Sequence, residues 1–183
     1  MDRRKAKTEK AIKSAFSALI QREKYADISI QDIIDEADVA RATYYDHFKS
    51  KEEVLVSISS GIFAHITDEA LHAEKHHDFS HKQDFSHRII HMLYHLSEEK
   101  EVIAGILRSE GRDIFLTDLR THLYTLFGGN VRPSGRFKDV PEEILVNHAV
   151  NSMTELTLWW IGKNGCDFPP ERIAEYYFTF MEA

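Results

Sequence analysis

The chain has 183 residues, of which 43% are hydrophobic and 29% charged, a composition typical of globular proteins rather than disordered ones. The formal net charge is −7, and the single cysteine, Cys166, excludes an internal disulfide framework and favours a reducing compartment. No apolar run reaches about 18 residues, and the N-terminus lacks the apolar core of a secretory signal, so we expect no membrane span and a cytoplasmic location.

The charge is distributed unevenly along the chain. Residues 1–22 hold seven Arg and Lys residues against two acidic ones, whereas residues 56–183 hold most of the acidic residues. A basic N-terminal part on an acidic body suits contact with an anionic partner, although basic termini are also common without such a role.

Apolar residues recur at helical spacing in the first 40 positions. The first helix is predicted from Thr8, its N-cap, to about Gln21. The second begins at Ser29, whose hydroxyl can bond the amide of Asp32 in a capping box. Asp38 follows at a turn, where Asp tolerates a left-handed backbone. The predicted buried faces of the two helices are Ile12, Ala15, Phe16, Leu19 and Ile20, and Ile30, Ile33, Ile34 and Ala37.

A third helix over about 41–48 would complete a helix-turn-helix motif within residues 29–48, with Val39, Tyr44 and Phe48 in the core. The second helix of this motif presents side chains to base edges in the major groove of DNA. Arg41 can bind guanine through two hydrogen bonds, and Thr43 can bond a base edge. Tyr45, His47 and Lys51 suit phosphates, as does Ser29 at a helix N-terminus. The groove-facing candidates are Ala40, Arg41, Ala42, Thr43 and Tyr45.

Three packed helices in an ordinary all-α core would show part of this pattern. The run over 43–52, TYYDHFKSKE, is more specific. Together with Tyr25 and the spacing of Ile33, Ala37 and Val39, it resembles the DNA-binding domain of the TetR/AcrR family of bacterial transcription regulators, over about residues 5–55.

This resemblance implies an all-α protein of about nine helices, with a DNA-binding domain at 1–55 and a regulatory and dimerisation domain at 56–183. It further implies a homodimer, a palindromic double-stranded DNA operator and an unidentified small-molecule effector. The DNA contacts at matching positions are Ser29, Arg41, Ala42, Thr43, Tyr45, His47 and Lys51.

Three residues depart from the family pattern or oppose DNA binding. Asp38 replaces a glycine often found at the turn, and Ala40 replaces a Ser or Thr that often caps the third helix. Asp46 places a negative charge near the DNA face, where it should repel phosphate unless it points away or pairs with Lys49.

The rest of the chain is predicted as long helices. A fourth helix begins at a capping box of Ser50 and Glu53 and runs to about Lys75, followed by a histidine-rich connection at 76–81. Further helices are expected at about 83–97, 99–108, 112–127, 141–163 and 170–181, with a loop at 130–139.

The helix at 141–163 is apolar on more than one side, so it should be buried on both. The resemblance implies a dimer made by the last two helices, whose predicted interface residues are Val146, Val150, Met153, Ile161, Ile173, Tyr177 and Phe180. The predicted walls of a ligand pocket are Phe63, Met92, Phe115, Tyr124, Phe127, Met153 and Trp159. The alternative for both sets is that they are plain core.

Eleven histidines occur, and His87, His91 and His95 recur one turn apart. Pairs at this spacing can chelate zinc. The apolar face around Ile89 and Leu93 places the three on the other side of the helix, so we expect a solvated face and no metal or cofactor. Metal or proton sensing is the alternative.

No glycine-rich phosphate loop, Cys/His metal signature or nucleophile elbow is present, so we expect no enzyme. The acidic pairs 98–99 and 142–143 are predicted at helix starts, where they favour the N-terminus. The expected function is a sequence-specific transcriptional repressor that a small molecule releases from DNA. The alternative is a regulator, including an activator, that a partner protein controls without a small-molecule ligand.

Overall fold

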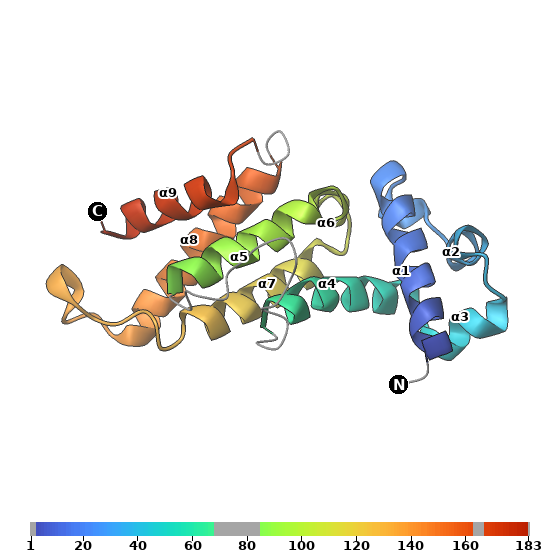
Figure 1. Ribbon diagram of the computed structural model, residues 1–183, viewed down its shortest axis with the longest axis horizontal. Coiled ribbons are helices and arrows are strands. Elements are labelled where there is room, and N and C mark those ends of the chain that lie inside the picture. Colours follow the sequence, from blue (N-terminus) through green and yellow to red (C-terminus); the bar gives the residue numbers. More distant parts are fainter. Residues whose placement is uncertain (1–2, 68–84, 163–166, 183) are drawn as a thin grey trace. The chain divides into compact units, whose positions relative to one another are not determined.

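The computed structural model describes residues 3–67, 85–162 and 167–182 (Figure 1). These residues form nine α-helices and no β-strand, so the predicted all-α fold with an N-terminal helix-turn-helix is confirmed. Two 3₁₀ turns, Tyr25–Asp27 and Gly135–Phe137, lie in the predicted linker and loop. The helices are α1 (Arg3–Arg22), α2 (Ile30–Ala37), α3 (Arg41–His47), α4 (Lys51–Thr67), α5 (Phe85–Glu98), α6 (Lys100–Leu107), α7 (Arg112–Phe127), α8 (Glu142–Gly162) and α9 (Pro170–Glu182).

Helix α1 begins at Arg3 rather than at Thr8, so the predicted Thr8 cap is wrong. Arg, Lys and Ala are strong helix formers, which favours the extension of the helix over residues 3–7. The pair at 98–99 also differs from its prediction, because Glu98 ends α5 instead of starting a helix. The predicted end of α4 near residue 75 and the connection at 76–81 lie outside the described residues.

The N-terminus of α4 has a modified capping box. The Ser50 hydroxyl accepts a hydrogen bond from the Glu53 amide at 3.3 Å, as predicted. The Glu53 carboxylate, however, accepts from the amide of Lys49 at 2.7 Å rather than from that of Ser50. The side chain of Glu53 therefore ties α4 to the chain leaving α3.

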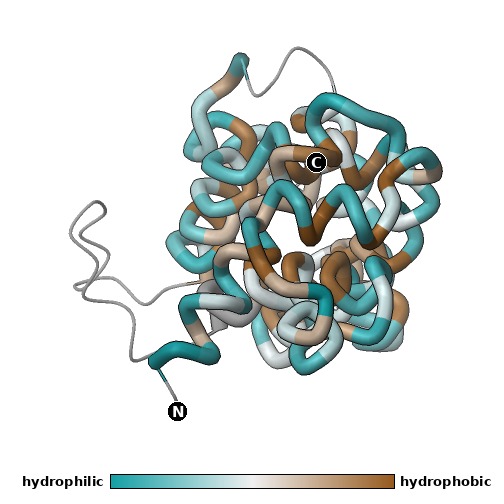
Figure 2. The backbone as a smooth tube through the Cα atoms, turned by 90° about the vertical axis from the view of Figure 1, so that its right-hand side faces the viewer, coloured by the Kyte–Doolittle hydropathy of each residue, from teal (hydrophilic) through white to brown (hydrophobic). Residues whose placement is uncertain are grey.

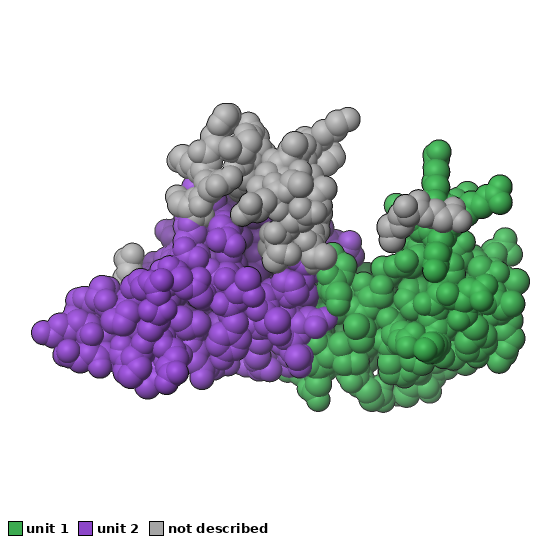
Figure 3. Space-filling view, turned by 90° about the horizontal axis from the view of Figure 1, so that it is seen from below, with its two compact units in different colours: residues 1–61, 101–115 green, residues 62–100, 116–183 purple. Residues whose placement is uncertain are grey.

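The chain divides into two compact units (Figure 3). Unit 1 comprises Met1–Gly61 and Glu101–Phe115, and unit 2 comprises Ile62–Lys100 and Leu116–Ala183. Unit 1 therefore holds α1, α2, α3 and nearly all of α6, with the first parts of α4 and α7. The sequence pattern placed a division after residue 55 and did not link residues 101–115 to the N-terminal helices.

The core of unit 1 forms where α1 packs against α2. Ile12 and Phe16 of α1 and Ile33 of α2 are fully buried. Hydrophilic and hydrophobic residues alternate along the helices, as amphipathic packing requires (Figure 2). Helix α6 joins this core through Gly105, where a Cβ atom would lie only 2.7 Å from the carbonyl oxygen of Ile20. The missing side chain therefore lets α6 approach the backbone of α1.

In unit 2, α9 packs against both α5 and α8. The buried hydroxyl of Tyr177 in α9 donates a hydrogen bond to the Ala149 carbonyl of α8 at 3.0 Å. The indole of Trp160 donates to the Phe168 carbonyl at 2.9 Å, which fixes the chain entering α9. Among the described residues, no helix has both the length and the apolar character to span a membrane.

The histidine face of α5 differs from its prediction. His95 is only 8% exposed, and His87 and His91 are half-buried, so the expected solvated face is wrong at His95. Helical periodicity gives the direction of a side chain relative to its own helix, but it does not show which other parts of the chain cover that side.

Candidate DNA-binding site

Helix α2 is fixed at its start by a reciprocal capping box. The Ser29 hydroxyl accepts a hydrogen bond from the Asp32 amide at 3.2 Å, and the Asp32 carboxylate accepts from the Ser29 amide at 2.8 Å. The Ser29 hydroxyl also donates to the same carboxylate at 2.6 Å, and these bonds hold the pKa of Asp32 below its usual value. The predicted capping box is therefore confirmed, with an ionised carboxylate at the helix N-terminus.

The turn after α2 depends on Asp38, whose φ of 51° and ψ of 50° lie in the left-handed region. Within the described ranges it is the only non-glycine residue with positive φ. The next amide, of Val39, donates to the Ile34 carbonyl at 3.2 Å and closes the turn. The predicted left-handed turn is confirmed, and Asp occupies it in place of glycine.

Helix α3 turns one aromatic ring inward and its polar side chains outward. Tyr44 is fully buried, and burial raises the pKa of its hydroxyl to about 12, so the ring stays neutral. Its neighbour Tyr45 is 43% exposed and meets Tyr44 edge to face. Arg41 and Ala42 are also exposed, and Thr43 is half-buried. Ala40 caps the helix without a side-chain hydrogen bond, as expected from its lack of a hydroxyl.

Arg41 lies at the centre of a polar cluster that spans α2 and α3. Its guanidinium donates to the Gln31 side-chain oxygen at 3.1 Å and to the Tyr45 hydroxyl at 3.5 Å. The guanidinium carbon lies 5.5 Å from the centroid of the Tyr45 ring, within range of a cation–π interaction. Gln31 in turn donates to Asp35 at 2.8 Å. The exposed surface of the motif therefore presents a positioned Arg with a neighbouring amide and phenol.

Lys51, at the start of α4, is bound to the protein itself. Its ammonium group donates to the carbonyl oxygens of Tyr25 at 2.7 Å and Ile28 at 2.9 Å, and it lies 4.2 Å from the centroid of the Tyr25 ring. The Tyr25 hydroxyl donates to the Glu52 carboxylate at 2.9 Å. Lys51 and Glu52 therefore clamp the linker between α1 and α2 onto α4, and one ammonium proton remains for another acceptor.

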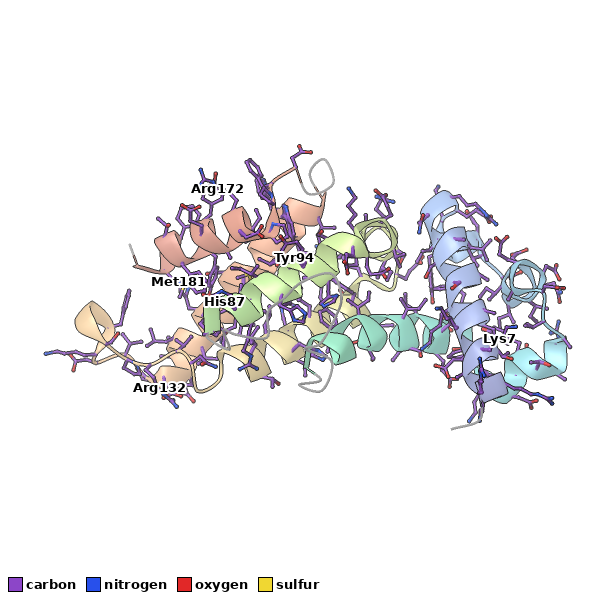
Figure 4. The ribbon with its side chains drawn as sticks, viewed as in Figure 1. Lys7, His87, Tyr94, Arg132, Arg172 and Met181 are labelled. Atoms are coloured by element: carbon purple, nitrogen blue, oxygen red, sulfur yellow. The ribbon has the colours of Figure 1, made fainter. Side chains whose placement is uncertain are left out.

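His47 is half-buried at the end of α3, close to α1. The pKa of the Glu9 carboxyl is lowered mainly by its bond to Lys13, with a smaller contribution from His47. The basic side chains Arg3, Lys5, Lys7 and Lys10 are exposed on the same end of α1, from which Lys7 projects in Figure 4. Positive groups therefore gather on α1 beside the end of α3.

Two acidic groups oppose this positive surface. Asp46 is exposed, and no ion pair between it and Lys49 occurs in the described part of the chain. Asp32 is exposed beside Ser29. This carboxylate would repel a phosphate at the N-terminus of α2. The Ser29 hydroxyl can therefore bind a phosphate only if its hydrogen bonds to Asp32 break.

Five of the seven predicted pocket residues are buried and two are exposed. Phe63, Met92, Phe127 and Met153 are buried in unit 2, and Phe115 is buried in unit 1. Tyr124 is 43% exposed and Trp159 is 45% exposed, so they belong to the surface of the single chain. A half-buried polar ring lies against this buried set, because His122 stacks on Phe63 with ring centroids 4.6 Å apart.

Six of the seven predicted interface residues lie inside the single chain. Val146, Val150, Met153, Ile161, Ile173 and Tyr177 are at most 9% exposed, whereas Phe180 is 72% exposed. The exposed apolar side chains of the same region are Ile144, Trp159 and Phe168 with Phe180. Periodicity alone did not distinguish the side of α8 that faces its own core from the side left to a partner.

Sequence reasoning missed several of the residues that build this surface. Gln31 was not singled out, although it is a polar residue one turn before Asp35 on the exposed face of α2. The structural use of Lys51 was missed because its carbonyl partners are more than 20 positions away in sequence. Ile144 and Phe168 were not singled out, because apolar residues of the core and of an exposed face are of the same types.

Comparison with known proteins agrees with this geometry. Residues 13–58 match the model of bacterial regulatory proteins of the tetR family, and residues 83–183 match that of a transcriptional regulator C-terminal region. The chain is 27% identical over its whole length to YxbF of Bacillus subtilis, an uncharacterised helix-turn-helix transcriptional regulator, and spans 46% of that protein.

Solved structures share the fold over nearly the whole chain. A TetR transcriptional regulator from Streptococcus agalactiae superimposes with a TM-score of 0.73 at 28% identity, covering 98% of this chain and 96% of that one. The dihydroxyacetone kinase operon activator DhaS superimposes with a TM-score of 0.68 at 19% identity, covering 96% and 94%. With a matching family model at each end of the chain and a helix-turn-helix of the expected geometry, the chain belongs to the TetR family of transcriptional regulators.

Proposed function

We propose that this protein is a repressor that binds a palindromic operator and leaves it when a small molecule binds elsewhere in the chain. The observation that carries the DNA-binding part is the register of α3. Tyr44 is buried, and Arg41, Ala42 and Tyr45 are turned outward from a rigid turn at Asp38. A recognition helix requires this division between an anchored face and a free polar face.

The proposed contacts divide into base and phosphate contacts. Arg41 and Thr43 read base edges, and Ala42 allows close approach and touches a thymine methyl group. Tyr45, His47, Ser29 and the remaining ammonium proton of Lys51 contact phosphates. The basic side chains at the start of α1 add attraction to the same polyanion, which explains how a chain of net charge −7 can bind DNA.

The proposed active form is a homodimer, as is general among TetR-family regulators. The exposed apolar side chains Ile144, Trp159, Phe168 and Phe180 of α8, α9 and the segment between them supply the surface for a second copy. Two-fold symmetry would place the two recognition helices about one DNA turn apart, roughly 34 Å, and would require an operator with matching half-sites.

The proposed regulation is a linkage between two sites. Residues 1–55 bind DNA, and residues 56–183 bind the effector and the second copy. Helix α4 contributes residues to both compact units, since Gly61 ends unit 1 and Ile62 begins the next part of unit 2. Movement of α4 on effector binding would change the position of the DNA-binding helices and lower operator affinity.

A second function rests on one relative. Over 62 residues the chain is 37% identical to DhaS of Lactococcus lactis, which is described as an operon activator. This relative favours activation. The alternative function is a regulator, including an activator, that a partner protein controls without a small-molecule ligand. In either case the protein acts where the DNA is, in the cytoplasm.

Selection of bound fragments from genomic DNA tests the proposal. We expect enrichment of an inverted repeat by the wild type and none by the Arg41→Ala variant. A reporter placed behind the selected operator then separates the two functions, because deletion of the regulator raises expression for a repressor and lowers it for an activator. Failure of the wild type to enrich any sequence contradicts both.

A further inference from the structure

Two imidazoles on α5 point their ring nitrogens at each other. His91 and His95 lie one turn apart, with their Nε2 atoms 3.0 Å apart and their ring planes at 80°. Only one proton fits between two nitrogens at this distance, so one of them presents a lone pair to the other. The two Nε2 atoms are therefore close enough to be neighbouring ligands of one ion.

The carboxylate of Glu98 lies beside Nδ1 of His95 and favours one tautomer of its ring. Its Oε2 atom lies 3.3 Å from the Nδ1 atom of His95. A carboxylate only accepts hydrogen bonds, so its position favours a proton on Nδ1 of His95, which leaves the lone pair of Nε2 for His91. Histidines that bind metals have this same arrangement, in which the distal ring nitrogen donates to a carboxylate.

His91, His95 and Glu98 differ in how far their side chains are exposed. His95 is 8% exposed and held in place, His91 is half-buried, and the Glu98 side chain is 54% exposed. Beside them, Tyr94 projects from α5 and donates a short hydrogen bond to Glu171 of α9 (Figure 4). The donor pair therefore lies on a helix whose position is fixed by its packing, and its exposure increases from the buried His95 to the half-buried His91.

We propose that His91 and His95 form a two-imidazole site for a divalent transition-metal ion, with Glu98 as the residue that orients His95. At a metal–nitrogen distance of about 2.1 Å, an Nε2–Nε2 separation of 3.0 Å corresponds to an angle of about 90° at the ion. This is the angle between neighbouring ligands of an octahedral ion, and imidazole ligands suit Ni²⁺, Cu²⁺ and Zn²⁺.

The described side chains supply two nitrogen ligands to the proposed site. In the part of the chain that the structure describes, no three His, Cys, Asp or Glu side chains gather in a way that could hold a metal ion. The proton between the two rings leaves when the ion enters, either to the other nitrogen of His91 or to solvent.

The test is calorimetric titration of the tag-free, metal-free full chain with NiCl₂. Other histidines contribute background binding, so the comparison is between variants. We expect His91→Gln and His95→Gln each to bind one ion fewer per chain than the wild type. His148→Ala, which removes an exposed imidazole of α8, should bind as many as the wild type. Glu98→Gln should keep the ion but bind it about 10-fold more weakly.

Thermal melting without metal shows whether each variant is folded. Because His91 is only half-buried, the His91→Gln variant should remain folded even if substitution at the buried His95 does not. Equal stoichiometry and affinity for the wild type and His91→Gln would overturn the proposal. A similar loss in His148→Ala would overturn it as well, because binding would then be a property of surface histidines in general.

Discussion

The ammonium group of Lys51 lies 4.2 Å from the ring centroid of Tyr25 and donates a hydrogen bond to the carbonyl oxygen of the same residue. The two residues belong to different elements of unit 1, α4 and the 3₁₀ turn after α1. A residue expected to contact DNA is thus also part of the internal structure of the DNA-binding helices.

Replacement of Lys51 by Met should separate these two roles. The change leaves two carbonyl oxygens without their charged donor, so the free energy of unfolding should fall by about 1–3 kcal/mol. If the remaining proton also contacts a phosphate, the slope of log affinity against log salt should become shallower by about one for each subunit. Chemical unfolding and operator titrations at several salt concentrations measure both.

Lys49→Met is the matched control for stability, because Lys49 is exposed and its side chain makes no internal bond in the described structure. We expect little change in its unfolding free energy. A stable Lys51→Met variant would contradict the clamp, and an unchanged salt slope would restrict Lys51 to its structural role.

Arg41→Ala should lower operator affinity by about 1–3 kcal/mol in each half-site, because it removes the base contact at the centre of the exposed cluster. Gln31→Ala should have a smaller effect, since Gln31 orients the guanidinium from α2. Electrophoretic mobility shift and light scattering measure DNA binding and subunit association. Arg88→Ala on the exposed face of α5 is the control, and undiminished binding by Arg41→Ala would refute the register of α3.

The features that were predictable from the sequence are local ones. The capping box of Ser29 and Asp32, the left-handed Asp38 and the inward Tyr44 each depend on residues within a few positions. Propensity and capping rules describe that range of contacts, and the family motif adds the recognition helix. Most of the predicted helix bounds agree with the structure for the same reason.

Contacts distant in sequence were not predictable. Gln31 meets Arg41 only after the turn folds, and Gly105 meets Ile20 only when α6 joins unit 1. The two apolar sides of α8 carry the same residue types, so their assignment to core or partner needs the positions of neighbouring helices. The burial of His95 was not predicted for the same reason.

Ser29→Ala should lower the free energy of unfolding by about 1 kcal/mol, the usual contribution of an N-cap. It should also change the pH dependence. The pKa of Asp32 is lowered in the folded state, so its stabilising contribution is complete above the unfolded pKa of about 3.9 and is lost as pH falls through the folded value. Urea unfolding of wild type and variant between about pH 6 and pH 2 tests this, and the two curves should converge at the acid end.

Gly105→Ala should destabilise unit 1 by about 1–3 kcal/mol, because the new Cβ would lie 2.7 Å from a backbone oxygen of α1 and would force the helices apart. Gly61→Ala is the matched control, since nothing lies within 4 Å of a Cβ there. That substitution in the middle of α4 should stabilise the protein by about 0.5–1 kcal/mol. Equal effects of the two changes would show that α6 does not need the close approach.

Phe180→Glu and Trp159→Glu should each convert the proposed dimer to monomers. Phe180 is 72% exposed in the single chain, so a carboxylate there costs little in an isolated subunit. Trp159 is 45% exposed, and its replacement also removes the stacking of its ring on Phe168. At a two-fold interface each change buries two like charges without partners, which is strongly unfavourable. Light scattering at several protein concentrations measures the association. Val56→Glu, at an exposed apolar position of α4, is the control that should leave the dimer intact. Persistence of the dimer in both variants would place the subunit contact outside the exposed residues of α8 and α9, because no symmetric interface that includes them would tolerate the paired carboxylates.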